Sequence, residues 1–503
     1  MANPVTDFDD IQGLVRSGYG KLPEACFILL RIADPAAARS WLADIRLTTI
    51  QDMLRQRLDE AVHVALTADG LRALGVAEDI VGRFSAEFCT GIAVDDSRSR
   101  RLGDVGTNAP SSWQWGAGKQ LPHVLVMLYA DTIARLQALQ RAIEEKIRQC
   151  GVNPPHVLPA VNIDDTDRKE PFGFADGISQ PQIDWEGERA PGTNADLRYG
   201  NLIAPGEFLL GYPNEYGLYT DRPLLDSAQD PERALPAAGD DNGHRDLGRN
   251  GTYLVFRQLQ QDVQEFWRFV QAQAGGDRLA SVRLAESMVG RRMTGEPLVT
   301  SSGGPMRGVG GTAEELKLNQ FTYEDDEDGL RCPLGAHIRR ANPRNGDMPG
   351  GTKEGLGKLV RTFGFGNKTV RDDLIASSRF HRILRRGRPY GIPVAQGRRP
   401  SAAADGDLGL HFICLNANIS RQFEFIQNAW IMSADFDGQR GESDPLLGNR
   451  EPLADGCSTD GFTQPQPSGL RRHLTGLPRF IAVRGGGYFF LPGLRALRFL
   501  ARA

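Results

Sequence analysis

One pattern recurs four times along this chain and restricts the folds that it can adopt: a run of five to eight apolar or β-branched residues, a short polar break, and an amphipathic helix. The four apolar runs are residues 25–32, 123–129, 252–256 and 410–415. After the first run, Asp34 and Pro35 supply a helix N-cap and a first-turn proline. After the third run, apolar residues return at i, i+3, i+4 and i+7 from Val263, which is the helical period. Each run therefore predicts a strand that leads into a helix.

Two strand–helix units in each half of the chain are what a β-α-β-β-α-β, ferredoxin-like domain produces, with each helix covering one face of an antiparallel sheet. A length of 503 residues allows two such domains. We therefore predict an α+β fold of duplicated ferredoxin-like domains, the N-terminal one at residues 1–245 and the C-terminal one at residues 246–503.

A long insertion interrupts the pattern at residues 182–250, which are rich in Gly, Pro and Asp and show no clear periodicity. It is too long for an ordinary connection between two elements. The insertion is either a lid or binding loop, or a decoration of the surface.

Charge and apolar patterning exclude several classes of protein. The chain has 59 Lys and Arg against 63 Asp and Glu, a formal charge of −4, which argues against nucleic acid as a partner. Residues 1–19 lack the basic and apolar regions of a signal peptide, and no stretch reaches about 18 uninterrupted apolar residues. We therefore expect no membrane partner and a cytoplasmic location, with secretion left open. The six cysteines form no C-x-x-C pair, which removes zinc-ribbon and thioredoxin-like interpretations.

His337 is the histidine whose surroundings suggest chemistry. It lies in the segment CPLGAHIRRANPR, residues 332–344, directly after the small residues Gly335 and Ala336. Small neighbours would let a flat ligand approach, and the arginines that follow could face carboxylates on that ligand. These arginines are Arg339, Arg340 and Arg344. The alternative is a structural histidine beside a solvated basic stretch.

Two further segments carry candidate catalytic side chains. Asp176 lies in EPFGFADGISQP, residues 170–181, either as part of an ordinary Asp-Gly turn or as a carboxylate placed for proton transfer, whose pKa an apolar setting raises. Arg385 and Arg386 follow two apolar residues in HRILRRGRPYG, residues 381–391. They belong either to a solvated face or to a pocket, where a fixed guanidinium stabilises developing negative charge.

Together these segments resemble the dye-decolorizing peroxidases, a family of haem enzymes. The shared features are a G-x-x-D-G signature from Gly173 to Gly177, the segment AHIRRANPR, and the segment ILRRG, which occur in the family's order. The resemblance extends from the opening DIQG at residues 10–13 to GGGYFFLPG near the C-terminus. The length and the insertions resemble the family's larger subgroup, and the family's pair of ferredoxin-like domains agrees with the periodicity.

The resemblance implies roles for particular residues around haem b, iron protoporphyrin IX. His337 would be the proximal ligand to the iron. Asp176 would move a proton on the distal side, and Arg385 would stabilise negative charge as the O–O bond of hydrogen peroxide breaks. Arg339 is the expected partner of a haem propionate. The glycines of the signature that would lie at the cofactor are Gly173 and Gly177.

The expected activity is the reduction of hydrogen peroxide coupled to one-electron oxidation of an aromatic dye or a phenolic compound. A haem carrier without peroxidase turnover and an interaction protein without a cofactor are the alternatives. Asp176 and Arg385 favour the peroxidase, since a carrier needs no distal proton shuttle. Some family members have an aspartate after the strand equivalent to LHFICL, where this chain has Asn418. The acceptor for the second N–H of His337 is therefore expected to be Asn418 or, if it reaches, Asp435 or Asp437.

Overall fold

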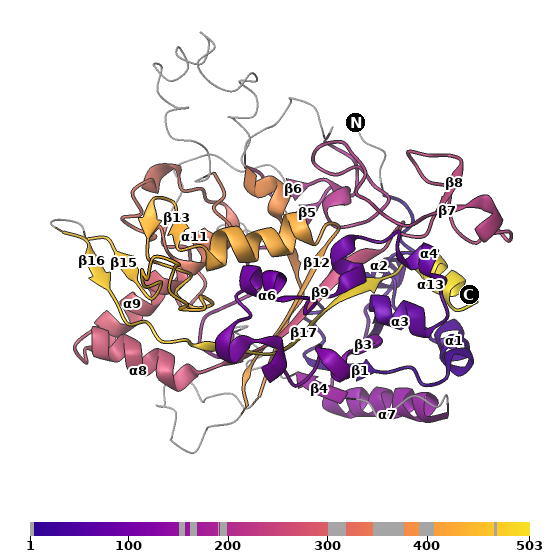
Figure 1. Ribbon diagram of the computed structural model, residues 1–503, viewed down its shortest axis with the longest axis horizontal. Helices are drawn as coiled ribbons and strands as arrows, with labels where there is room; N and C mark the ends of the chain where they lie inside the picture. Colours follow the sequence, from indigo (N-terminus) through magenta and orange to yellow (C-terminus); the bar gives the residue numbers. More distant parts are fainter. Residues whose placement is uncertain are drawn as a thin grey trace, which may run out of the picture.

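A central antiparallel sheet organises the molecule, and helices cover it (Figure 1). The computed structural model describes residues 5–149, 156–160, 169–189, 191, 199–299, 318–345, 377–391, 407–466 and 470–502. Within these residues, the main sheet has the strand order β10-β12-β9-β17-β2-β3-β1-β4, and β11 also pairs with β12. Its N-terminal strands are β1 (Glu24–Leu30), β2 (Glu60–Leu66), β3 (Val124–Ala130) and β4 (His156–Ala160). Its C-terminal strands are β9 (Thr252–Gln261), β10 (Leu384–Arg385), β11 (Arg388–Tyr390), β12 (Gly409–Asn416) and β17 (Ile481–Leu491).

Each half of the chain forms one ferredoxin-like unit. In the first half the strands lie in the antiparallel order β4-β1-β3-β2, and the crossover helices are α1 (Pro35–Asp44) and α7 (Ile133–Gln149). In the second half the order is β17-β9-β12, with β10 and β11 at the edge. Here α8 (Val263–Gln273) follows β9, and the helical segments η10 (Ser420–Glu424) and η11 (Ile426–Met432) follow β12. The prediction of an α+β fold with duplicated ferredoxin-like domains is confirmed.

The two units meet edge to edge, where Phe490 of β17 pairs with Leu66 of β2. The expected boundary between residues 245 and 246 falls inside β8 (His244–Asp246), which pairs with β7 (Leu224–Asp226) of the insertion. The second unit begins at β9. The division of the chain into independent domains therefore stays a prediction.

The four apolar runs form β1, β3, β9 and β12, and each leads into a helical segment as predicted. The side chain of Asp34 caps α1 by accepting hydrogen bonds from the backbone N–H groups of Ala36 and Ala37. The strands are buried on both faces, β3 along its whole length. Because both faces are covered, the apolar runs within these strands are continuous and show no regular alternation of apolar and polar residues.

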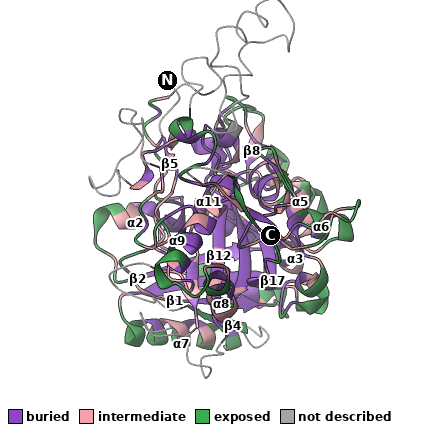
Figure 2. Ribbon diagram, turned by 90° about the vertical axis from the view of Figure 1, so that its left-hand side faces the viewer, coloured by how far each residue is buried: buried purple, intermediate pink, exposed green. Residues whose placement is uncertain are grey.

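Figure 2 shows that the strands of the sheet are buried, and two hydrophobic clusters lie on the two faces of the sheet. Alternate residues of β1 divide between them: Ile28 belongs to one cluster, and Phe27 to the other. The Phe27 cluster also contains Phe256 of β9 and Phe489 of β17. Side chains from both halves of the chain therefore share this cluster.

The insertion at residues 182–250 packs on the core where the structure describes it. Ile203, Phe208 and Leu209 are completely buried in the cluster of Phe27. Glu207, also completely buried, pairs with Arg421 of η10 at 2.8 Å. These contacts favour a built-in part of the fold over a surface decoration.

The remaining elements are short and surround the sheet. The other α-helices are α2 (Ile50–Arg55), α3 (Ala68–Ala73), α4 (Glu78–Val81), α5 (Ala86–Thr90), α6 (Asp96–Leu102), α9 (Arg278–Val289), α11 (His337–Ala341) and α13 (Leu494–Leu500). The other strands are β5 (Gln182–Ile183), β6 (Leu202–Ile203), β13 (Asp435–Phe436), β14 (Gln439–Arg440), β15 (Phe462–Gln464) and β16 (Arg472–Leu474). Single 3₁₀ turns include η1 (Gly13–Val15), η7 (Glu324–Asp326) and η9 (Ser377–His381). Within the described ranges, no helix has both the length and the apolar character needed to cross a membrane.

Candidate active site

A cavity of about 250 Å³ collects the segments that the sequence singled out. It lies between the loop at residues 170–181, the short helix α11, β10 and η11. Much of its wall is apolar, from Phe172, Phe174, Leu259, Phe412, Phe423, Leu446 and Leu447. A mainly apolar wall with a few converging polar groups is typical of a binding site for a small organic molecule or cofactor.

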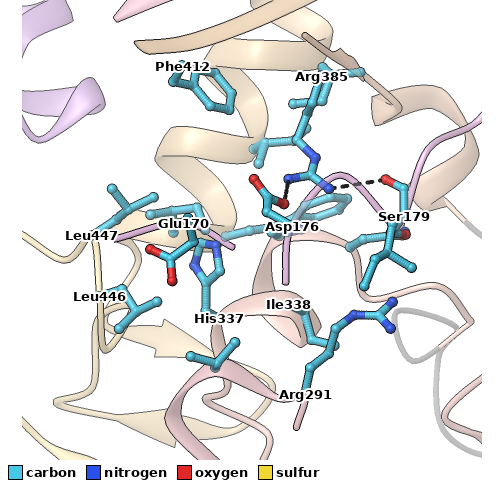
Figure 3. A pocket seen from close by; sticks show the side chains of 18 of the residues that line it. Glu170, Asp176, Ser179, Arg291, His337, Ile338, Arg385, Phe412, Leu446 and Leu447 are labelled. Carbon is cyan, nitrogen blue, oxygen red and sulfur yellow. Dashed lines mark hydrogen bonds and ion pairs between the residues drawn. The ribbon is translucent and has the colours of Figure 1, made fainter. Parts of the chain in front are cut away.

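His337 begins α11, and its side chain projects into this cavity (Figure 3). Its Nδ1 lies 2.9 Å from Oδ2 of Asp444. Burial acts to lower the pKa of His337, but the Asp444 carboxylate outweighs burial and raises it. With Nδ1–H donated to the carboxylate, Nε2 is the nitrogen left to bind a metal, and it has no hydrogen-bond partner among the described residues.

Burial and two backbone hydrogen bonds hold the Asp444 side chain in place beside His337. It is completely buried, and its Oδ1 accepts hydrogen bonds from the backbone N–H groups of Leu446 and Leu447 at 2.9 and 2.8 Å. The expectation that Asn418, Asp435 or Asp437 would accept the hydrogen bond is wrong. The Asn418 side chain instead accepts a hydrogen bond from the backbone N–H of Arg421, at the start of η10. A carboxylate, not an amide, therefore supports His337.

Asp176 and Arg385 form an ion pair that faces the same cavity as His337 (Figure 3). Nη1 of Arg385 lies 2.6 Å from Oδ1 of Asp176, and Nη2 donates to the backbone carbonyl of Ser179 at 3.4 Å. Arg386, the first residue after β10, does not line the cavity and donates to the backbone carbonyl of Leu14. Of these two arginines, Arg385 is therefore the one that faces the cavity.

The pKa of Asp176 moves in the direction opposite to the one that the sequence suggested. Burial alone would raise the pKa of its carboxyl, but the Arg385 guanidinium outweighs burial and holds the pKa below its usual value. The carboxylate is therefore the stable form, which is the form that can accept a proton.

The two signature glycines shape the loop that carries Asp176 and do not line the cavity. Gly173 has a φ of +100° and Gly177 a φ of +79°, which L-residues with side chains rarely adopt. A Cβ at Gly173 would lie 2.9 Å from Cε of Met293. At Gly173 the loop turns tightly, and its N–H donates to the carbonyl of Glu170 at 2.8 Å. Their predicted place at the cofactor stays a prediction.

Arg339 does not face the cavity, contrary to its expected role. Its guanidinium is buried and donates to the carbonyls of Asp326 and Cys332, at 2.9 and 3.0 Å. Arg340 is buried as well and donates to the carbonyl of Trp430 at 2.8 Å, which ties α11 to η11. Both arginines therefore fix the position of α11.

The small residues before His337 do not make room for a ligand, contrary to expectation. Neither Gly335 nor Ala336 lines the cavity. A Cβ at Gly335 would lie 3.2 Å from Oε2 of Glu442, and Ala336 is completely buried in a cluster with Phe321. Their size lets α11 pack against its protein neighbours.

Three other arginines line the cavity, and none forms an ion pair with a carboxylate within the described part of the chain. Arg344 donates to the carbonyl of Phe321 at 2.7 Å, Arg382 to Oδ1 of Asn201 at 2.8 Å, and Arg291 to the carbonyl of Gly295 at 2.7 Å. Only Arg344 was among the candidates from sequence. Unbalanced guanidinium groups at a cavity wall attract an anionic ligand.

Comparison with known proteins decides the family. No family model matches the chain. A dye-decolorizing peroxidase of Mycetinis scorodonius is 30% identical over 516 residues, which cover 97% of this chain and 86% of that protein. A multifunctional dye peroxidase of an Amycolatopsis species is 27% identical over 514 residues, 94% of this chain and 91% of that protein. The chain belongs to the dye-decolorizing peroxidase family.

The structural comparison agrees with this assignment. A crystal structure of a decolorizing peroxidase from Auricularia auricula-judae has a TM-score of 0.72 to this structure and 26% sequence identity. The match covers 99% of this chain and all of the other. Dye-decolorizing peroxidases are haem enzymes, and this protein is a peroxidase that uses hydrogen peroxide to oxidise dyes and phenolic compounds. The family resemblance inferred from the three segments is confirmed.

Sequence reasoning missed several side chains of the site. Asp444 precedes a proline in a polar stretch, and nothing in that stretch marks it as the partner of a histidine 107 residues earlier. Glu170, Arg291, Arg382 and His381 also line the cavity. Glu170 begins the EPFGFADG segment, and the five apolar or glycine residues that follow it were the one available signal.

Proposed function

We propose that the cavity binds haem b, that Nε2 of His337 is the axial ligand to its iron, and that Asp176 and Arg385 act on hydrogen peroxide bound there. The observation that carries this proposal is the pairing of His337 with the buried Asp444, opposite an ion pair that lines the same cavity. A carboxylate behind an imidazole orients the ring and strengthens it as a metal ligand.

The residues of the cavity fit haem in three respects. The apolar wall suits a porphyrin ring, and His337 presents a free ring nitrogen. Arg344, Arg382 and Arg291 lack carboxylate partners within the described residues, so they are suited to hold the two propionates. Tyr199 supports this group, because its hydroxyl accepts a hydrogen bond from Arg382 at 3.1 Å. Arg344 therefore replaces Arg339 as the proposed propionate partner from the segment AHIRRANPR.

Asp176 and Arg385 have different roles in the reaction with hydrogen peroxide. Bound haem supplies the redox chemistry that accepts oxygen from peroxide and electrons from the reductant. Asp176, kept ionised by Arg385, takes the proton from one oxygen of hydrogen peroxide and gives it to the other, which leaves as water. The Arg385 guanidinium stabilises the negative charge that develops as the O–O bond breaks. Its hydrogen bond to the Ser179 carbonyl keeps it in place.

Haem titration of two histidine variants tests the proposal. His337→Ala should bind haem at least tenfold more weakly and change the Soret absorption of any complex. His381→Ala is the matched control, because His381 also lines the cavity but stacks on Phe425 with ring centroids 3.7 Å apart. The control should keep haem and its spectrum. Unchanged haem binding in His337→Ala, or loss only in His381→Ala, would exclude His337 as the ligand.

A further inference from the structure

Glu170 is a second carboxyl group on the wall of the cavity, on the same loop as Asp176 (Figure 3). Its Oε1 accepts a hydrogen bond from the N–H of Phe174, and its Oε2 accepts one from the N–H of Phe172, both at 3.0 Å. Unlike Asp176, Glu170 forms no ion pair with any described residue. A carboxyl group on a cavity wall that is not paired with a cation needs another means to balance its charge, and a proton is the simplest.

Gln261 of β9 can form a hydrogen bond with Glu170 in either protonation state of the carboxyl group. Its Nε2 donates to Oε2 of Glu170 at 2.8 Å, which suits the carboxylate. Its own Oε1 is buried and has no hydrogen-bond partner among the described residues. Rotation of the amide by half a turn would place Oε1 against Glu170, where it would accept a hydrogen bond from the protonated acid. Both side chains line the cavity, so this exchange takes place at its surface.

The groups around Glu170 favour reversible protonation of its carboxyl group near neutral pH. Burial is the main cause that raises its pKa to about 7, against the hydrogen bonds from Phe174, Phe172 and Gln261. The Asp176 carboxylate on the same loop raises it further, while the neighbour on β9 is the neutral Gln261. The environment therefore separates the two carboxyl groups: Asp176 is held ionised, and Glu170 is protonated at or below neutral pH.

The reaction consumes protons that do not come from peroxide itself. Reduction of one hydrogen peroxide to two waters breaks the O–O bond and takes up two electrons and two protons, and two reductant molecules supply one electron each. Asp176 only moves a proton of peroxide from one oxygen to the other, so the first water needs no outside proton. The remaining oxygen must receive two protons before it leaves as the second water.

We propose that Glu170 delivers protons to this second oxygen, one for each electron, and is reprotonated from water between the two deliveries. The inference rests on the proposed function of the cavity and adds a residue to it. Glu170 thus holds the protons that are consumed, whereas Asp176 holds the proton that is only relocated.

Infrared spectroscopy of the haem-loaded enzyme measures the proton on Glu170 directly. The wild-type protein should show a carbonyl stretch of a protonated carboxylic acid that disappears as the pH rises through about 7. The contribution of Glu170 is the part of this band that Glu170→Gln loses, because the buried Glu207, whose pKa is also raised to about 7, contributes equally in both proteins. In Gln261→Leu the loss of the amide hydrogen bond should shift the titration to higher pH, since that bond lowers the pKa of Glu170. Identical titrating bands in the wild type and in Glu170→Gln, or the absence of such a band in the wild type, would overturn the proposal.

Steady-state kinetics separates proton delivery from a structural role in the loop. In Glu170→Gln, kcat/KM for hydrogen peroxide should change by less than about twofold, while kcat/KM for a one-electron phenolic reductant should fall by at least about tenfold. If Glu170 only positioned Asp176, the peroxide value would fall and the reductant value would keep its pH dependence.

A second variant tests the same inference without changing Glu170 itself. In Gln261→Leu, which keeps both backbone hydrogen bonds to Glu170, the fall of kcat/KM for the reductant with rising pH should move to higher pH. This variant tests the proposal even if Glu170→Gln folds poorly.

The outcomes also distinguish this inference from the proposed function. If the wild type binds no haem, the proposed function fails. If it binds haem and reacts with peroxide but the infrared band and the reductant kinetics do not change in the variants, only the role of Glu170 fails.

Discussion

At the scale of single residues, the ion pair between Arg385 and Asp176 determines which protonation state the cavity offers to peroxide. The sequence suggested that an apolar loop would raise the pKa of Asp176, because a pattern of neighbours along the chain does not show charges that approach from elsewhere. Arg385, far away in sequence, reverses the shift. A lowered pKa means that the carboxylate persists as the pH falls, and proton acceptance is lost only when the pH passes below that lowered value. The geometry therefore supports activity in acid solution.

Arg385→Leu tests both functions of the arginine. Removal of the guanidinium leaves Asp176 buried without its cation, so the pKa of Asp176 should rise. The acid limb of kcat/KM for hydrogen peroxide should then move to higher pH, and its plateau should fall by about a hundredfold or more because the developing negative charge loses its partner. Stopped-flow measurement of the peroxide reaction from acid to neutral pH checks this. An acid limb that stays in place would show that Arg385 does not control Asp176.

The hydrogen bond from His337 to Asp444 makes a second prediction at this scale. Asp444→Asn keeps the shape of the side chain but replaces a carboxylate by a weaker acceptor, so haem affinity should fall by about tenfold to a hundredfold. Asn418→Asp is the control, because the sequence alone named Asn418 and the structure places it at the start of η10. Haem titration of the two variants should show an effect only in Asp444→Asn; a comparable loss in Asn418→Asp would contradict the assignment.

At the scale of elements, the geometry of α11 explains why Arg339 does not line the cavity. Successive residues of a helix are 100° apart, so Arg339, two positions after His337, lies on the far side of the helix from the cavity. Ile338 and Ala341, one and four positions after His337, line the cavity instead. Arg344 reaches the cavity because the chain has left the helix and turned, with a φ of +58°. The helical period was available from the sequence, but the helix end was not.

The loop from Glu170 to Gly177 makes a prediction about its two glycines. Both adopt positive φ, but only Gly173 has a neighbour within contact distance, Cε of Met293 at 2.9 Å. Gly177→Ala should lower the free energy of unfolding by about 1 kcal/mol, the usual cost of a left-handed backbone. Gly173→Ala should lower it by about 2 kcal/mol or more, since a φ of +100° lies further from the range of alanine and the methyl group also displaces Met293. Urea unfolding of both variants checks the order, and an equal effect would refute it.

The strand–helix units could be predicted because each is a local pattern of apolar residues. Strands β2 and β17 were not among the predicted strands, for different reasons. In β2 the apolar run contains His63, which is buried and bonded to Tyr19 and Gln12, contacts that no local pattern reveals. In β17 three consecutive glycines break the run, because Trp115 packs against the strand at Gly485. Elements shaped by distant partners are therefore the ones that local periodicity misses.

At the scale of the whole molecule, the N-terminal segment joins the two ferredoxin-like units. Nε2 of Gln12 donates to the carbonyls of Val64 in β2 and of Pro492 just after β17, both at 2.9 Å. Nη2 of Arg388 in β11 donates to the carbonyl of Tyr19 at 2.6 Å. These hydrogen bonds are buried and connect residues that are far apart in the chain. A duplicated pattern in the sequence predicts two similar units, but it does not show that they share one core.

The shared core predicts that the molecule unfolds as one cooperative unit, although its length alone would allow two. Phe27 from the first unit and Phe256 from the second pack with ring centroids 5.5 Å apart, so neither unit can open without exposing the interior of the other. Hydrogen exchange in increasing urea should give the same midpoint for peptides from β3 and from β12, the central strands of the two units. A fragment of residues 1–250 should lack protected amides in β3, because its half of the core would face water. Two separate midpoints, or a fragment with native protection, would instead establish two independently stable domains.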